Sequence, residues 1–310
     1  MPDSTPNQRG AIVTSPLGSI SRLEAWVIAA RPRTLPAAVA PVLVGSGLAH
    51  HEGVFRWDSF LLAMVGALAI QVAANFANDA SDAGRGADVE RIGPPRMVTL
   101  GIIEVRQMWM AVGAAIGVSA ITGIWLFTIA GWPILVIGVV SVVAMLTYVG
   151  GPIPYGYRGL GEVMVFVFFG LVATVGTRFA HDGTAGISAW VLGIVMGSLA
   201  AAILMANNIR DIETDARAGK RTLAVALGPE RSLRLYTILV LAPFALIAIG
   251  AALGWIPVLA GLAVVLMPLV KPLVKQVSSG DPTRLIAALG GTARLQLLVA
   301  LFLTAASIAT

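Results

Sequence analysis

Residues 59–82 read SFLLAMVGALAIQVAANFANDASD, an apolar run that ends in asparagines and aspartates. Its apolar part has the length of about 20 residues that an α-helix needs to cross the hydrocarbon core of a bilayer. The whole chain has the same character. Of its 310 residues, 57% are hydrophobic and 12% are charged, against about 25% charged in soluble domains, and its mean hydropathy is +0.86. We therefore predict an all-α, polytopic membrane helix bundle.

Apolar runs separated by charged or Pro/Gly-rich breaks predict about nine transmembrane helices. The expected spans are 34–50, 59–78, 108–128, 132–149, 161–180, 188–208, 234–253, 255–273 and 289–309. We expect one transmembrane domain over 34–310, preceded by a cytoplasmic N-terminal segment, 1–33, with an interfacial helix. The first 20 residues are polar, so we expect no removable signal peptide. Cysteine is absent, which excludes disulfides and thiol chemistry.

The basic residues predict the orientation of the bundle. With nine spans, 19 of the 21 Lys and Arg residues fall on one face, and only Arg56 and Arg178 fall on the other. Cytoplasmic loops carry the excess of Lys and Arg. We expect a plasma-membrane protein with its N-terminus inside and its C-terminus outside. The net charge of +5 then reflects topology and anionic lipid rather than nucleic-acid binding.

Two acidic motifs follow the second and sixth expected spans, a correspondence that suggests an internal repeat. The first motif covers 75–88, and the second covers 207–221. On a helix, the polar residues of each motif share a face, while Glu213 points elsewhere. The aligned residues are Asn75, Asn78, Asp79 and Asp82 in the first motif, and Asn208, Asp211 and Asp215 in the second.

Two facing sets of carboxylates would repel each other unless a cation lies between them. Oxygen ligands without His or Cys suit Mg²⁺, which keeps substrate phosphate oxygens in its shell. The expected metal ligands are Asp79, Asp82, Asp88, Asp211 and Asp215. Amides and cations beside them would hold a diphosphate: Asn75, Asn78, Arg85, Arg91, Asn208, Arg210, Lys220 and Arg221. Solvated helix caps would explain one such motif, but two matched motifs favour a site.

At these motifs the sequence resembles the UbiA superfamily of intramembrane prenyltransferases, within it most closely the 1,4-dihydroxy-2-naphthoate polyprenyltransferases. The resemblance spans most of residues 25–230 and rests on four passages. These are ARPRTLP at 30–36, the first motif with RIGP at 91–94, PYGYRGLGE at 154–162, and the second motif with GKRTLAV at 219–225. In the commoner superfamily pattern the third Asp follows the second by four residues. Here Asp88 follows Asp82 by six, a spacing found in the naphthoate branch.

The resemblance implies Mg²⁺-dependent transfer of a polyprenyl group from its diphosphate to 1,4-dihydroxy-2-naphthoate, with loss of the carboxyl group, to give demethylmenaquinone. The residues implied in catalysis are Asp79, Asp82, Asp211, Asp215, Tyr148 and Lys220, and those implied in acceptor binding are Arg22, Arg33, Tyr148, Tyr155 and Glu162. Arg31 is a further cation that could reach the acceptor's carboxylate. An allylic cation needs a dry chamber with π faces, for which Tyr148, Tyr155, Phe76 and Phe166 are the candidates.

Three alternatives remain open at this point. A related enzyme would prenylate another aromatic acceptor such as 4-hydroxybenzoate. A secondary transporter would also use repeats and intramembrane polar residues, but its site should lie near the bilayer midplane, whereas these motifs lie at helix ends. A non-catalytic scaffold gives no reason for paired Asp faces. The sequence leaves the prenyl chain length and any homo-oligomeric state undetermined.

Overall fold

The computed structural model describes residues 20–84, 95–150 and 154–310, without the side chains of Asp82 and Val149. All regular elements in these ranges are helical, as predicted. The elements are α1 (Arg22–Ala30), η1 (Pro32–Thr34), α2 (Pro36–His51), α3 (Trp57–Gly84), α4 (Val105–Ala130), α5 (Pro133–Val149), η2 (Tyr155–Tyr157), α6 (Gly161–Phe166), η3 (Val167–Val172), α7 (Ala173–Asp182), α8 (Ile187–Arg210), α9 (Ile212–Arg217), α10 (Leu223–Ala252), η4 (Val258–Leu269), α11 (Val270–Val277) and α12 (Pro282–Ala309).

Within the described residues, seven helical stretches are long and apolar enough to cross a membrane. An eighth is the stretch from α1 to α2, which bends by 53°. The bend lies between Thr34 and Pro36, and Arg31, whose φ of 53° is left-handed, separates α1 from η1. The remaining expected span, 132–149, is the shorter apolar helix α5. Every expected span therefore corresponds to a helix in the described residues, and seven or eight of these helices are long enough to cross a membrane.

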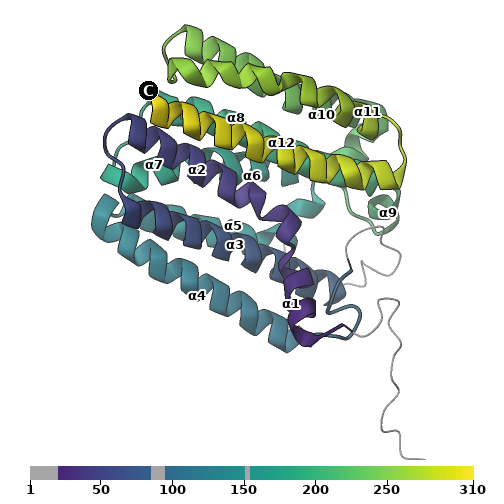
Figure 1. Cartoon of the computed structure of the whole chain (residues 1–310). Coiled ribbons are helices and arrows are strands. Elements are labelled where there is room, and N and C mark those ends of the chain that lie inside the picture. The colour runs from purple at the N-terminus through teal and green to yellow at the C-terminus, as the bar shows by residue number, and fades with distance from the viewer. Residues whose placement is uncertain (1–19, 85–94, 151–153) are drawn as a thin grey trace, which may run out of the picture.

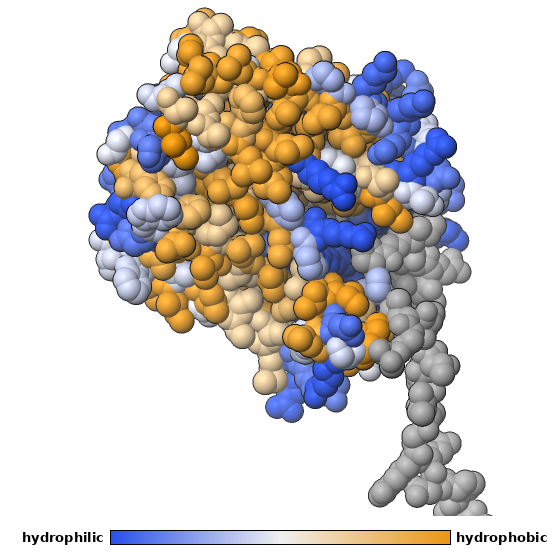
Figure 2. Space-filling model, viewed as in Figure 1, coloured by the Kyte–Doolittle hydropathy of each residue, from blue (hydrophilic) through white to orange (hydrophobic). Residues whose placement is uncertain are grey.

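The long helices lie side by side in one bundle (Figure 1). The closest partners are α3 with α4, α8 with α10, and α2 with α12. Apolar side chains dominate the surface across the middle of the bundle, whereas hydrophilic residues gather toward the helix ends (Figure 2). Exposed residues of this belt include Ile121, Trp125, Val139, Leu262 and Val265. An apolar surface this extensive is what lipid contact requires.

Helix α8 is the centre of the packing. Its Leu192, Met196 and Leu199 are fully buried in the largest apolar cluster. On another side it meets η3, where glycines let the two backbones approach: a Cβ added at Gly170 would lie 2.3 Å from the Cα of Gly197. Small residues at such crossings are typical of membrane helix pairs. This contact fixes the helix that carries η3 against the helix that ends in the second motif.

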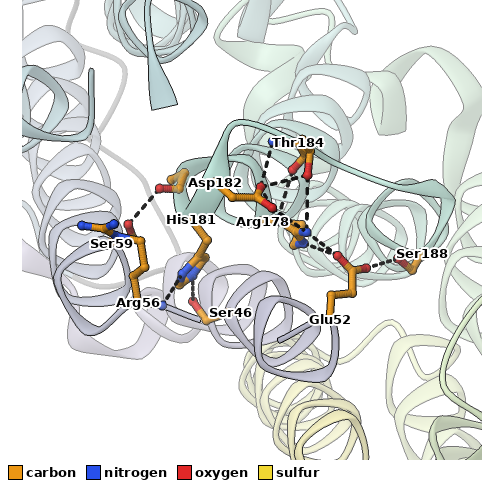
Figure 3. A network of polar contacts seen from close by, with 10 residues as sticks. Ser46, Glu52, Arg56, Ser59, Arg178, His181, Asp182, Thr184 and Ser188 are labelled. Carbon is orange, nitrogen blue, oxygen red and sulfur yellow. Dashed lines mark hydrogen bonds and ion pairs between the residues drawn. The ribbon is translucent and has the colours of Figure 1, made fainter. Parts of the chain in front are cut away.

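The helix ends opposite the two motifs are joined by a polar network (Figure 3). Arg178 of α7, only 3% exposed, pairs with Glu52 after α2 and with Asp182, 2.8 Å away. His181 accepts the backbone N–H of Arg56 at its Nδ1 atom (3.0 Å) and contacts Ser46 through Nε2 (3.2 Å). The network contains both Arg56 and Arg178, the two basic residues that were expected on the membrane face opposite the other nineteen. It joins the ends of α2 and α7 to the starts of α3 and α8.

Candidate active site

The first motif lies at the far end of α3, and its Asp79 is turned toward the protein backbone. Asp79 is 2% exposed, and its two carboxylate oxygens accept the N–H groups of Met97 (3.0 Å) and Val98 (3.2 Å). Arg96, also buried, and Arg31 act electrostatically on this carboxylate. Asp79 therefore fastens the turn before α4 to the end of α3.

The two asparagines of the first motif have different surroundings from Asp79. Asn75 donates through Nδ2 to the carbonyl oxygen of Ala30 (2.8 Å) and to Oγ1 of Thr34 (3.0 Å), which ties α3 to the bend between α1 and α2. Asn75 and Asn78 also line an apolar cavity that Asp79 does not reach. Four residues after Asn78 comes Asp82, on the same helix face. The side chain of Asp82, and the whole of Arg85, Asp88 and Arg91, lie outside the described residues.

The second motif does not form the continuous helix that was expected. The helix breaks at Asp211, which ends α8 and precedes α9, with φ −98° and ψ 8°. Arg210 donates to both carboxylate oxygens of Asp211, from Nε at 2.7 Å and from Nη2 at 2.6 Å. Neighbouring side chains do not face each other on a helix, so this pairing accompanies the break. The helical spacing nevertheless continues across the break, because the N–H of Asp215 donates to the carbonyl oxygen of Asp211 at 2.8 Å.

The residues after the break contact the loop that precedes α6. The Nζ atom of Lys220 lies 3.9 Å from Asp215 Oδ1 and 4.7 Å from the ring centre of Tyr157. The backbone N–H of Arg221 donates to the Tyr157 carbonyl oxygen at 3.0 Å, although the Arg221 side chain is exposed. Glu213 is exposed, as its position on the helix predicted.

Glu162 provides a second link between these regions. It is 4% exposed, and its Oε1 atom accepts a hydrogen bond from Nδ2 of Asn208, itself buried, at 2.8 Å. Its Oε2 atom is buried without a hydrogen-bond partner in the described part of the chain. A capping role at the start of a helix would not need burial. The sequence had shown Glu162 as a candidate but contained no signal for its partner 46 residues away.

The cavity that Asn75 and Asn78 line is an apolar chamber of about 340 Å³. Its lining on α3 runs from Leu62 to Asn78, about 24 Å of helix. The other walls come from α2, α4, α5 and the α6–η3–α7 stretch. Small residues form much of them: Gly66, Ala67, Gly123, Gly138, Ser141, Ala173 and Gly176. The chamber thus extends from the first motif well into the apolar part of the bundle.

Two tyrosines stand at the motif end of the chamber, as the sequence analysis anticipated. Tyr148 and Tyr155 both line it, with ring centres 5.4 Å apart in an edge-to-face arrangement. Tyr155 donates its hydroxyl to the Ala144 carbonyl oxygen at 2.8 Å, and burial raises the pKa of Tyr155 to about 12. Gly156 packs on the ring of Tyr148, since a Cβ there would lie 3.0 Å from it. Both hydroxyl-bearing rings are therefore held in place by the loop.

The other two aromatic candidates, Phe76 and Phe166, do not line the chamber. Phe76 packs edge-to-face on Trp26 of α1, at 5.5 Å, in a separate apolar cluster. The chamber is lined by Phe168 and Phe169 rather than by Phe166. Both belong to η3, a π-helical stretch. Such stretches are rare and frequent at functional sites, and regular 3.6-residue periodicity could not predict this one.

The cations expected near the acceptor separate into two groups. Arg22 and Arg33 are exposed on α1 and η1. Arg31, between them, is partly buried and interacts electrostatically with Asp79. The backbone at Arg31 is left-handed, with φ 53°. Of the three arginines, Arg31 is the one that the structure associates with the first motif.

Among the described residues no group of three or more Asp, Glu or His side chains gathers, but the side chain of Asp82 and all of Asp88 lie outside them, so the facing of the two carboxylate sets stays a prediction. Of the carboxylates that are described, Asp79 is bonded to backbone amides and Asp211 to Arg210. What the motif ends do contain is a set of buried oxygen donors: Asp79, Glu162, Asn208 and Asp211. Hard oxygen donors of this kind, one of them unsatisfied, fit Mg²⁺ rather than a thiophilic or imidazole-bound metal.

Comparison with known sequences assigns the family. A sequence model described as the UbiA prenyltransferase family matches residues 38–298. The chain belongs to this family. Two relatives in it are 1,4-dihydroxy-2-naphthoate octaprenyltransferases: that of Mycobacterium tuberculosis is 41% identical over 68% of this chain and 72% of its own length, and that of Haemophilus influenzae is 37% identical over 90% and 94%.

Solved UbiA structures have the same fold. A UbiA homolog from Aeropyrum pernix K1 superposes with a TM-score of 0.65 at 17% identity, covering 88% of this chain and 97% of that one. A UbiA homolog from Archaeoglobus fulgidus, bound to GPP and Mg²⁺, superposes with a TM-score of 0.59 at 16% identity, covering 92% and 100%. The UbiA fold is therefore that of this chain.

Proposed function

We propose that this protein transfers a polyprenyl group from a polyprenyl diphosphate to 1,4-dihydroxy-2-naphthoate. The prenyl group replaces the carboxyl group, with release of CO₂ and diphosphate, so the product is the quinol form of demethylmenaquinone. One observation carries the proposal: a single apolar chamber joins the asparagines of the first acidic motif to the Tyr148–Tyr155 pair. The names of the relatives at 37–41% identity support the naphthoate acceptor and a long prenyl donor.

The diphosphate end is assigned to the two motifs. Asn78, Asp82, Asp88, Asn208, Asp211 and Asp215 would hold Mg²⁺, with Asp79 supporting them, and Arg85, Arg91, Arg210, Lys220 and Arg221 would take the remaining phosphate charge. Support comes from the A. fulgidus homolog, which was solved with GPP and Mg²⁺. When bound, Mg²⁺ neutralises the charge that develops as diphosphate leaves. Lys220 lies beside Asp215 and over Tyr157, where its ammonium group can face that charge.

The role proposed for Asp79 is support of the site through the backbone. Its oxygens already accept two N–H groups, and its side chain lies away from the chamber. Asn78, by contrast, lines the chamber, and Asp82 follows it on the same face of α3. We therefore assign direct contact to Asn78 and Asp82, and positioning of the following turn to Asp79.

The chamber serves the prenyl group and the acceptor. Loss of diphosphate leaves an allylic cation, which apolar walls shield from water and which the faces of Tyr148, Phe168 and Phe169 can stabilise. Tyr148, Tyr155 and Glu162 at the motif end would receive the aromatic acid. Arg31, Arg22 or Arg33 would then meet its carboxylate, Arg31 being the one already turned inward.

The orientation proposed from the basic residues places both motifs at the cytoplasmic face of the plasma membrane. A soluble aromatic acid would reach the site from the cytoplasm, and the prenyl donor from the bilayer. A transporter is not favoured, because the described charged clusters lie toward the two ends of the helices rather than at the midplane.

Substrate choice is tested with purified protein in detergent. The protein is given octaprenyl diphosphate, Mg²⁺ and either 1,4-dihydroxy-2-naphthoate or 4-hydroxybenzoate, and products are identified by mass. We expect a prenylated, decarboxylated product from the naphthoate, and none in the presence of EDTA. Product from the benzoate alone would refute the acceptor assignment. An Asp215→Asn variant, whose substitution lies in a half-buried position, serves as the inactive control.

A further inference from the structure

Glu162 is hydrogen-bonded to the second motif and, without lining the chamber itself, is close in sequence to residues that do. Val165, Phe168, Phe169 and Val172 of the same helical stretch line the chamber. Glu162 lies one turn before Val165, on the same helix face, and so continues this lining toward the motif. The neighbouring Gly161 confirms the location, since a Cβ there would lie 3.6 Å from the Tyr148 hydroxyl oxygen and 3.2 Å from Leu204, both chamber residues.

One oxygen of Glu162 is engaged with the second motif. The Oε1 atom accepts the Asn208 amide at 2.8 Å, and both side chains are buried. An amide has one donor end and one acceptor end. With its Nδ2 atom committed to Glu162, Asn208 is oriented so that Oδ1 is the end available to a ligand. Carbonyl oxygens of this kind are ligands for hard cations, and Asn208 precedes Asp211 by one turn.

The other oxygen of Glu162 has no hydrogen-bond partner within the described residues, although it is buried. A buried carboxylate oxygen left unsatisfied is unfavourable. Tyr148, one of the two rings assigned to the acceptor, lies close to the preceding residue, since a Cβ at Gly161 would lie 3.6 Å from its hydroxyl oxygen. A hydroxyl group of the acceptor is a donor of the right type to satisfy Oε2.

We propose that Glu162 is a positioning residue that links the two substrates: its Oε1 atom orients Asn208 toward Mg²⁺, and its Oε2 atom accepts a hydrogen bond from a hydroxyl of the aromatic acceptor. This inference rests on the proposed function and specifies how one side chain serves both ends of the site. Because the two contacts use different oxygens, they can be separated by substitution.

The test compares two variants, Glu162→Gln and Asn208→Ala, with a control, Glu213→Gln. The control makes the same Glu-to-Gln change at an exposed position of the second motif. In Glu162→Gln the amide oxygen still accepts from Asn208, but an NH₂ group replaces Oε2. We expect an acceptor KM raised about tenfold with the half-saturating Mg²⁺ concentration within twofold of wild type. In Asn208→Ala we expect the opposite: the half-saturating Mg²⁺ concentration should rise about tenfold, while the acceptor KM stays within twofold of wild type. Glu213→Gln should match wild type in both constants.

A second measurement identifies the donor group. The 1,4-dimethoxy analogue of the naphthoate lacks both hydroxyl donors, so as an inhibitor it should bind wild type and Glu162→Gln equally. A Glu162→Gln acceptor KM like that of wild type, an unchanged Mg²⁺ requirement in Asn208→Ala, or a tenfold loss of the dimethoxy analogue's affinity in Glu162→Gln would each overturn the link.

Folding is checked by size-exclusion profile and thermal unfolding. If Glu162→Gln fails to fold, Glu162→Asp replaces it. The shorter aspartate side chain withdraws both carboxylate oxygens, so it should raise both the acceptor KM and the half-saturating Mg²⁺ concentration. If neither value changed, the link would be refuted. A wild-type protein that forms no prenylated acceptor would refute the proposed function itself, whereas an active wild type with unshifted variants would refute only the role of Glu162.

Discussion

Arg210 and Asp211 are adjacent in the chain, yet their side chains form a two-bond ion pair at 2.7 and 2.6 Å in a buried position. The pair sits at the break between α8 and α9, where the second acidic motif begins. Asp211 therefore has its charge balanced within the protein, and the backbone direction of the motif depends on the same contact.

Arg210→Met should leave the Asp211 carboxylate buried without its partner. Removing one member of a buried pair typically costs about 3–5 kcal/mol, so we expect a clear loss of thermal stability. In the double variant with Asp211→Asn, stability should recover while prenyl transfer stays absent. Thermal unfolding in detergent measures the first effect, and product formation the second. Equal stability of Arg210→Met and wild type would show that the pair does not hold the break.

Asp79→Asn should affect both stability and activity. An asparagine oxygen can replace only one carboxylate oxygen, so one of the Met97 and Val98 amides loses its acceptor, at a cost of about 1–3 kcal/mol. We expect a lower unfolding temperature together with low activity. Asp215→Asn, at a half-buried position on α9, is the comparison and should lose activity with little loss of stability. Identical melting curves for Asp79→Asn and wild type would contradict the support role of Asp79.

Tyr155 should influence stability at high pH. Burial raises its pKa to about 12, whereas in the unfolded chain the group ionises near pH 10. Between these values the unfolded state has released the proton and the folded state retains it, so the stability contribution present below pH 10 falls as pH rises toward 12. Wild type should therefore lose thermal stability over this interval more steeply than Tyr155→Phe. Parallel pH curves would argue against a buried Tyr155 hydroxyl.

Gly138→Leu should fill the chamber. Gly138 lines it, and a Cβ there meets no atom within 4 Å, so the added side chain has room without displacing the core. We expect the KM for the prenyl donor to rise about tenfold or more, as one hydrophobic clash of 1–3 kcal/mol implies, with the unfolding temperature unchanged. Gly113→Leu, at an exposed position on α4 with equal free space, is the matched control. Donor kinetics unaffected by Gly138→Leu would exclude this chamber as the prenyl site.

Much of the architecture follows from local sequence. Runs of about 20 apolar residues identify spans because the bilayer thickness sets helix length, and helices occur at all nine expected positions, with α5 falling short of the length of a full crossing. Tyr148 and Tyr155 were expected from the family resemblance, and both line the chamber.

Side-chain partners were less predictable because they depend on contacts between distant segments. Asp79 is bonded to amides 18 and 19 residues away, and Glu162 to Asn208, 46 residues away. Helical periodicity places Asp211 one turn before Asp215, and the N–H of Asp215 does donate to the Asp211 carbonyl oxygen at 2.8 Å, but no local signal predicted the side-chain pair of Arg210 and Asp211. The π-helical stretch likewise places Phe168 and Phe169, instead of Phe166, against the chamber.

The central claim is a decarboxylating prenyl transfer, and the most direct measurement is its stoichiometry. Purified protein is supplied with octaprenyl diphosphate, Mg²⁺ and 1,4-dihydroxy-2-naphthoate labelled in its carboxyl carbon, and labelled CO₂, diphosphate and prenylated product are counted in one reaction. The account predicts one CO₂ and one diphosphate for each prenylated naphthoquinol. Diphosphate released without prenylated product, or a product that retains the labelled carboxyl group, would contradict it.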